Sequence, residues 1–142
     1  MGDGMVIRVR SFEPADRQAV VALWCEVFPG DPARNDPDAM IDRKLGVQPE
    51  LFLVGEIDGA IAATVVAGFD GVRGWVHHLA VAPALRRRGF GAQMMRAAEA
   101  GLAAVGCPKL NLQVRGANAG AVAFYERLGY AVEDRVSMGK VL

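Results

Sequence analysis

The sequence has few of the residues that cross-link or anchor a small protein. Its two cysteines, Cys25 and Cys107, lie far apart without a C-x-x-C or metal-ligand spacing, which predicts free thiols. Its apolar runs are broken by Gly, Asp or Arg well before the roughly 18 to 20 residues that a membrane span needs. We therefore expect a soluble protein that folds without disulfides or a structural metal.

An excess of charge of one sign is also absent. The 16 Lys and Arg residues balance the 16 Asp and Glu residues, so no overall field attracts the protein to nucleic acid or to an anionic membrane. The first four residues, Met1-Gly2-Asp3-Gly4, contain neither a basic region nor an apolar core. We expect no secretory signal, a cytoplasmic location, and neither nucleic acid nor membrane as a partner.

The 142 residues fit a single domain, in which hydrophobic periodicity predicts the order β-α-α-β-β-β-α-β-α-β. This order predicts an α/β fold with a mixed, mostly antiparallel sheet and helices on both faces. The strand-helix-strand unit over 75–114 makes its two strands parallel, and a ligand should bind beyond their carboxyl ends. The predicted strands cover 5–10, 51–57, 61–69, 75–81, 110–114 and part of 130–142; the predicted helices cover 14–28, 35–46, 89–105 and 118–129.

An arginine- and glycine-rich turn, Arg86-x-x-Gly89-x-Gly91, stands between a predicted strand and a predicted helix. Glycines allow an anion to approach the exposed N–H groups of a helix start, so this layout predicts a phosphate-binding turn. It is not the dinucleotide fingerprint, because Met94 occupies the place of the third glycine, and it lacks the Gly-Lys-Ser/Thr of a Walker loop. Solvation alone is the competing interpretation of its arginines.

These features resemble the GNAT (GCN5-related) family of acetyl-CoA-dependent N-acetyltransferases over nearly the whole chain, 1–142, as a single GNAT domain. The resemblance is carried by 79–81, the glycine turn, Asn118 at a helix start and the segment 124–130, Phe-Tyr-Glu-Arg-Leu-Gly-Tyr. Within the family the chain is similar to the YpeA-type bacterial branch, through segments such as Asn35-Asp36-Pro37 and Gly106-Cys107-Pro108-Lys109.

The resemblance implies a site for acetyl-CoA as co-substrate. The backbone of 79–81 would pair with the pantetheine arm where two strands splay, and N–H groups of 87–92 would hold the pyrophosphate. Tyr125 would be the general acid that protonates the departing thiolate, since a phenol is protonated at neutral pH. The implied cofactor-binding residues are Leu79, Ala80, Val81, Arg86, Arg87, Arg88, Gly89, Phe90, Gly91, Ala92, Asn118 and Tyr125.

The general base is not implied in the same way. Gln113 stands where the ribosomal-protein branch of the family has a glutamate, and an amide cannot accept the proton. A base from another element, a water chain and an acceptor that arrives neutral all stay open. His78 or His77 could act as the base, although packing alone would also explain each. Because neighbours on a strand point to opposite faces, at most one should face the cleft, and without a third ligand we expect no metal site.

The acceptor should enter past the first two helices, where aspartates could attract a cationic amine, although helix capping and solvation explain them equally: Asp31, Asp36, Asp38 and Asp42. The predicted function is acetyl transfer from acetyl-CoA to a primary amine of a small molecule or protein. Two alternatives are a non-catalytic acyl-CoA-binding sensor or partner module of the same fold, which Gln113 keeps open, and a nucleotide-binding regulatory domain. A homodimer is also left open.

Overall fold

The computed structural model describes residues 5–116 and 118–142. Residues 1–4 lie outside the described residues. The expectation that they form no secretory signal therefore stays a prediction. The chain forms two compact units, Met1–Leu112 and Gln113–Leu142. Within the described ranges, none of the helices has both the length and the hydropathy that crossing a bilayer would require.

The first unit is built on one sheet whose spatial order follows the chain, β1 to β5. Neighbouring strands from β1 to β4 are antiparallel, whereas β4 and β5 are parallel. The short gap between the strands predicted at 51–57 and 61–69 is a hairpin turn at Asp58 and Gly59, both with positive φ, as a two-residue turn requires. The strands are β1 (Arg8–Ser11), β2 (Phe52–Ile57), β3 (Ala60–Phe69), β4 (Gly74–Val81) and β5 (Leu110–Asn111).

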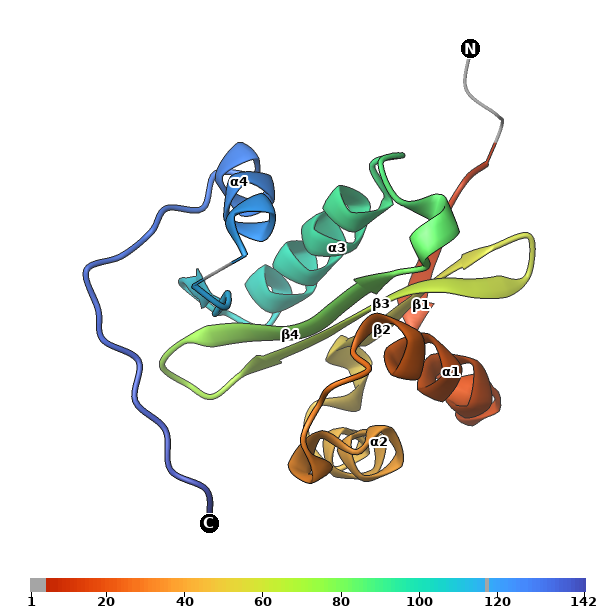
Figure 1. Cartoon of the computed structure of the whole chain (residues 1–142), viewed down its shortest axis with the longest axis horizontal. Coiled ribbons are helices and arrows are strands. Elements are labelled where there is room, and N and C mark those ends of the chain that lie inside the picture. Colours follow the sequence, from red (N-terminus) through yellow and green to blue (C-terminus); the bar gives the residue numbers. More distant parts are fainter. Residues whose placement is uncertain (1–4, 117) are drawn as a thin grey trace. The chain divides into compact units, whose positions relative to one another are not determined.

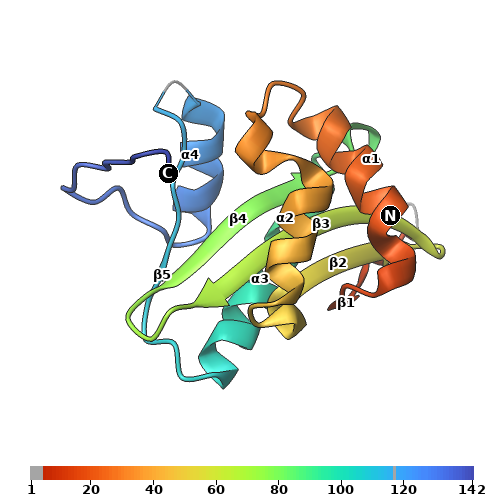
Figure 2. The same cartoon turned by 90° about the horizontal axis from the view of Figure 1, so that it is seen from below.

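Helices cover both faces of this sheet (Figures 1 and 2). The helices α1 (Arg17–Val27) and α2 (Pro37–Leu45) lie on one face, and α3 (Phe90–Ala104) lies on the other. The side chain of Asp36 caps α2 by accepting from the backbone N–H of Ala39, as the sequence predicts. The mixed sheet, its parallel pair and its two helical layers confirm the predicted fold class.

The core on the α1/α2 face joins aromatic rings from three elements. The Phe12 and Phe52 rings stack at 4.5 Å, and the Trp24 ring lies 5.8 Å from that of Phe52. The Trp24 residue is 2% exposed, so the first helix is fixed to the sheet at this point. The other buried members of this cluster are Val20, Leu23, Ile41, Val54, Val66 and Ala80.

The second unit contains α4 (Ala119–Arg127), capped by the side chain of Asn118 and followed by Gly129 with φ 96°. The predicted strands in 130–142 are wrong, because these residues form neither helix nor strand. Val136 and Met138 are 88% and 91% exposed. Within the described part of 113–142, no strand is present with which they could pair. The strand predicted over 110–114 ends at Asn111, where its ladder with β4 stops.

Candidate active site

An irregularity in β4 shapes the candidate site. Thr64 pairs with Ala80 and Val66 with His77, so β4 places one more residue than β3 between these two pairs. His78 lies in this bulge with φ 49°, a left-handed conformation that is uncommon for a residue other than glycine. Such a backbone persists only where the surrounding structure holds it, which is typical of functional sites.

The bulge places both histidines on the α1/α2 face. His77 lies opposite Val66, a member of the core cluster on that face, and the His78 ring contacts Trp24 and Phe28 of the same layer. The expectation that adjacent histidines point to opposite faces is therefore wrong here, because the extra residue interrupts the alternation. The two rings nevertheless line different hollows, and only His78 lines the one between α1 and α2.

The His78 ring is held on three sides. Its Nε2 atom lies 3.2 Å from Oδ2 of Asp31, and its centroid lies 4.9 Å from that of Trp24 and 4.5 Å from that of Phe28. Burial lowers the pKa of His78, and the Asp31 carboxylate opposes that effect. A lowered pKa keeps the imidazole neutral near pH 7, the form that can accept a proton.

The buried side chain of Thr64 holds the bulge in place through two hydrogen bonds. Thr64 is 0% exposed, and its hydroxyl accepts from Nε1 of Trp24 at 2.8 Å and donates to the carbonyl of His78 at 3.0 Å. The side chain thus satisfies a carbonyl at the point where the strand register shifts. Sequence reasoning missed Thr64, although a lone hydroxyl in the otherwise apolar 60–69 strand was a signal of a buried hydrogen bond.

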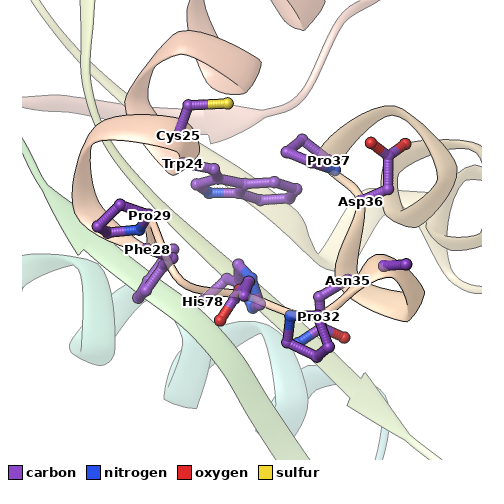
Figure 3. A pocket seen from close by; sticks show the side chains of 11 residues that line it. Trp24, Cys25, Phe28, Pro29, Pro32, Asn35, Asp36, Pro37 and His78 are labelled. Atoms are coloured by element: carbon purple, nitrogen blue, oxygen red, sulfur yellow. The ribbon is translucent and has the colours of Figure 1, made fainter.

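A cavity of about 250 Å³ opens beside His78. Figure 3 shows side chains from α1, the loop after it, the start of α2 and β4 around it. Asp31 and Asp36 are its acidic residues, whereas Asp38 and Asp42 pair with Arg17 at 3.1 and 2.6 Å and do not line it. The lining residues are Trp24, Cys25, Phe28, Pro29, Asp31, Pro32, Ala33, Asn35, Asp36, Pro37 and His78.

The glycine turn has the geometry of an anion-binding helix start. Gly89, the N-cap of α3, has φ 81°, and a Cβ built on it would meet no atom within 4 Å. The first N–H groups of a helix, here those of Phe90, Gly91 and Ala92, lack an acceptor within the helix. Arg86, three residues before Gly89, is in extended conformation, and its Nε donates to the carbonyl of Val81 at 3.4 Å.

The edge of β4 beyond Trp75 faces no strand within residues 5–112. The ladder with β5 contains only the pairs Gly74–Leu110 and Trp75–Asn111, which leaves 76–81 paired to β3 alone. The segment 79–81 therefore presents backbone groups along one free edge, the feature that the predicted pairing with an extended pantetheine arm requires.

Three predicted residues lie in the second unit. Asn118 Oδ1 accepts from the Ala121 N–H as a helix cap, and the Gln113 amide bonds to the Ser137 hydroxyl. The Tyr125 ring lies edge-on to Phe124 and Tyr130, at 5.0 and 5.8 Å. Burial raises the pKa of Tyr125, so its phenol is protonated at neutral pH. The predicted cofactor and acid roles of Asn118 and Tyr125 stay predictions.

Comparison with known proteins agrees with the fold. The family model described as "Acetyltransferase (GNAT) family" matches residues 17–130. An acetyltransferase of Yersinia enterocolitica is 41% identical over 138 residues, covering 96% of each chain. The crystal structure of Ard1 from Thermoplasma volcanium has a TM-score of 0.80 at 22% identity, covering 89% of this chain and 84% of that one. The aminoglycoside N-acetyltransferase AAC(6')-Iy has a TM-score of 0.81 at 17% identity, covering 96% and 99%. At these identities the two structural similarities show the fold alone.

Fold and sequence together define an acyltransferase with a five-stranded mixed sheet. The chain belongs to the acetyltransferase (GNAT) family. This confirms the family predicted from the glycine turn and the 124–130 segment. It also confirms the predicted class, an N-acetyltransferase that depends on acetyl-CoA as co-substrate.

Proposed function

We propose that this protein acetylates the primary amine of a small cationic acceptor bound in the cavity beside His78, with His78 as the general base. The observation that carries this proposal is the His78 ring itself. It stands at the bulge directly before the 79–81 edge, it lines the cavity, and it is hydrogen-bonded to Asp31. The base is then adjacent in the chain to the backbone predicted to hold the acetyl donor.

The tautomer of His78 follows from its partner. A carboxylate only accepts hydrogen bonds, so the contact with Asp31 requires the hydrogen on Nε2 and leaves the lone pair on Nδ1. In the reaction Nδ1 of His78 takes a proton from the bound ammonium, because only the neutral amine has a lone pair. The amine nitrogen then forms a bond to the thioester carbonyl carbon and releases its second proton to solvent. The carbon–sulfur bond then breaks, its electron pair goes to sulfur, and the CoA thiolate leaves.

The family resemblance assigns two further groups to this reaction, an oxyanion donor and a general acid. A backbone N–H of 79–81 stabilises the oxyanion that forms on the thioester carbonyl. Tyr125 gives its proton to the leaving thiolate, a role that its protonated phenol supports. The role of Tyr125 is tested by Tyr125→Phe, which removes the donor and keeps the ring.

The lining of the cavity supports a small cationic acceptor. Asp31 and Asp36 supply negative charge, and Trp24 and Phe28 add aromatic side chains to the lining. Three prolines, Pro29, Pro32 and Pro37, restrict the backbone around it. A volume of about 250 Å³ accommodates a small molecule or one side chain, but no folded surface.

The geometry of the donor side supports acetyl-CoA at the glycine turn. The unpaired N–H groups at the start of α3 and the unhindered Gly89 suit a pyrophosphate, and the arginines beside them add positive charge. AAC(6')-Iy, which shares the fold, was solved with a bisubstrate analog of CoA and acetylneamine. In AAC(6')-Iy, the same fold thus binds the CoA part and the amine part of one analog.

Release of the CoA thiol from acetyl-CoA over a panel of small primary amines tests this function. We expect turnover with cationic amines, a fall in kcat/KM of about 100-fold or more in His78→Gln, and little change in His77→Gln. The two variants are matched, because the residues are adjacent and only His78 lines the cavity. Tight acetyl-CoA binding without turnover on any amine would instead identify a sensor module.

A further inference from the structure

A second hollow lies on the same face of the sheet, at the opposite end of α2. It is an open groove of about 270 Å³ between the residues that follow α2, the end of β3 and the start of β4. The acceptor cavity includes Asp36 and Pro37 at the start of α2, whereas the groove includes Lys44, Val47 and Gln48 at and after its end. The two hollows are thus separated by about the length of α2.

Lys44 is the cation of this groove. It is half-buried, and its ammonium donates to the carbonyl of Ala67 at 2.6 Å. Among the described residues, no carboxylate lies within ion-pair distance of it. Burial lowers the pKa of Lys44, and the negative charge of Glu50 opposes that effect. An ammonium has three donors, so others are left for a ligand.

His77 adds a second basic group to the groove. Its pKa is lowered by the protein packed around its ring and, secondly, by the Lys44 ammonium. The Asp70 carboxylate also lies in the lining, but its Oδ1 accepts from the backbone N–H groups of Val72 and Arg73, both at 2.8 Å. Since the Asp70 carboxylate accepts from the backbone, the Lys44 ammonium is the charged donor of the groove that an anionic ligand would meet.

The rest of the groove is rigid and apolar. The Gln48 amide is held by the backbone of Phe69, since it donates to the Phe69 carbonyl at 3.0 Å and accepts from the Phe69 N–H at 2.7 Å. Trp75 and Phe69 provide aromatic surface. An apolar wall with one unpaired cation is the lining expected for an organic anion rather than for a hydrated inorganic ion.

We propose that this groove binds a carboxylate of the acceptor, so that the acceptor is an amino acid or short peptide with its amine in the cavity beside His78 and its carboxylate on Lys44. The proposal rests on the function proposed above. Amine and carboxylate must then be about 10 Å apart, because Pro37 of the cavity and Lys44 of the groove lie seven residues apart on α2, at about 1.5 Å each. On β4, His78 lies three residues from Trp75, which is also about 10 Å. An extended tripeptide has this separation between its termini, at about 3.5 Å per residue.

The test compares glycyl-glycyl-phenylalanine with its C-terminal amide, which differ in one negative charge. With the full chain and acetyl-CoA, we expect kcat/KM to be about tenfold higher for the acid. Lys44→Met should remove this preference, so that acid and amide are acetylated with equal kcat/KM. Arg96→Gln, which removes one positive charge from α3 on the opposite face, should keep it.

Binding without turnover gives an independent readout. Calorimetry should show about tenfold tighter binding of the acid than of the amide to the wild type, and equal binding of both to Lys44→Met. Equal rates and affinities for acid and amide in the wild type, or a preference that survives Lys44→Met, would overturn the carboxylate subsite. A failure of the proposed function would give a different result. Neither peptide would then be acetylated, whereas calorimetry would still show tighter binding of the acid than of the amide.

Discussion

The Thr64 hydroxyl donates to the carbonyl of His78, so a fully buried side chain of β3 holds the one left-handed residue of β4. The same hydroxyl accepts from the indole of Trp24, which joins α1 to the bulge. The orientation of the proposed base therefore depends on a hydrogen-bond chain that runs from Trp24 through the fully buried Thr64 to the backbone of His78. Several consequences of this arrangement are measurable.

Replacing Thr64 by valine keeps the shape of the side chain and removes both hydrogen bonds. It leaves a buried carbonyl and an indole N–H unpaired, so the free energy of unfolding should fall by about 1–3 kcal/mol. Because the His78 bulge relaxes, kcat should fall while the KM for acetyl-CoA stays near that of the wild type. Thr64→Ser keeps the hydroxyl and should recover most of kcat. Wild-type kcat in Thr64→Val would show that the bulge needs no such support.

Asp31→Asn tests the electrostatic role of the carboxylate. Asp31 raises the pKa of His78 against the larger lowering effect of burial. Removing its charge should therefore move the acidic limb of the kcat/KM profile to lower pH, since the imidazolium loses its stabilising partner. The plateau should also fall, because the ring loses its orienting acceptor. A limb that moves to higher pH would contradict the assigned contact.

Gly89→Val tests the anion-binding turn. A Cβ at this position, φ 81°, meets no protein atom within 4 Å, but the side chain of valine would obstruct the approach of a pyrophosphate to the start of α3. Calorimetry should show acetyl-CoA affinity reduced more than about tenfold in a folded protein. Gly71→Val is the control, because Gly71 also has an open Cβ position and a positive φ, 96°, but lies in a distant hairpin turn. Equal losses of affinity in both variants would point to unfolding rather than to the turn.

Asp16→Asn tests an ion pair that fixes β1 to the first helix. Arg10 binds both carboxylate oxygens of Asp16, at 2.7 and 3.0 Å, and also contacts Glu56. The loss should cost about 2–3 kcal/mol, less than for a fully buried pair because Arg10 keeps Glu56. Arg10 holds the pKa of Asp16 below its ordinary value, so its stabilisation is complete above that value and is lost as pH falls below it. Urea unfolding of wild type and variant between pH 7 and pH 3 should therefore converge toward acid.

The sequence predicted the helix caps, the hairpin turn and the helix start, which depend on interactions between residues close together in the chain. Asp36 and Asn118 cap the helices that they were expected to cap, Asp58-Gly59 makes the hairpin turn, and Gly89 begins α3. Each depends on residues within one turn of the chain. The strands predicted in 130–142 are wrong, because an apolar segment forms a strand only where a partner edge is present.

The acid–base site could not be predicted in the same way. Asp31 and His78 are 47 positions apart, and the bulge that turns His78 toward Asp31 depends on how β3 and β4 pair. The sequence predicts an acceptor-side role for Asp31 only as one of four aspartates, and gives no sign that Pro29 and Pro32 line the cavity beside it. A strand-register shift leaves no pattern in a single sequence, so two adjacent histidines gave no reason to prefer His78.

The pH dependence of kcat/KM for acetyl transfer, measured for wild type, His78→Gln and His77→Gln, tests the role of His78 most directly. We predict a wild-type acidic limb with its midpoint below the ordinary pKa of histidine, retained in His77→Gln. His78→Gln should lose this limb together with about 100-fold or more of the plateau. A wild-type limb and plateau in His78→Gln would contradict the assignment of His78 as the base.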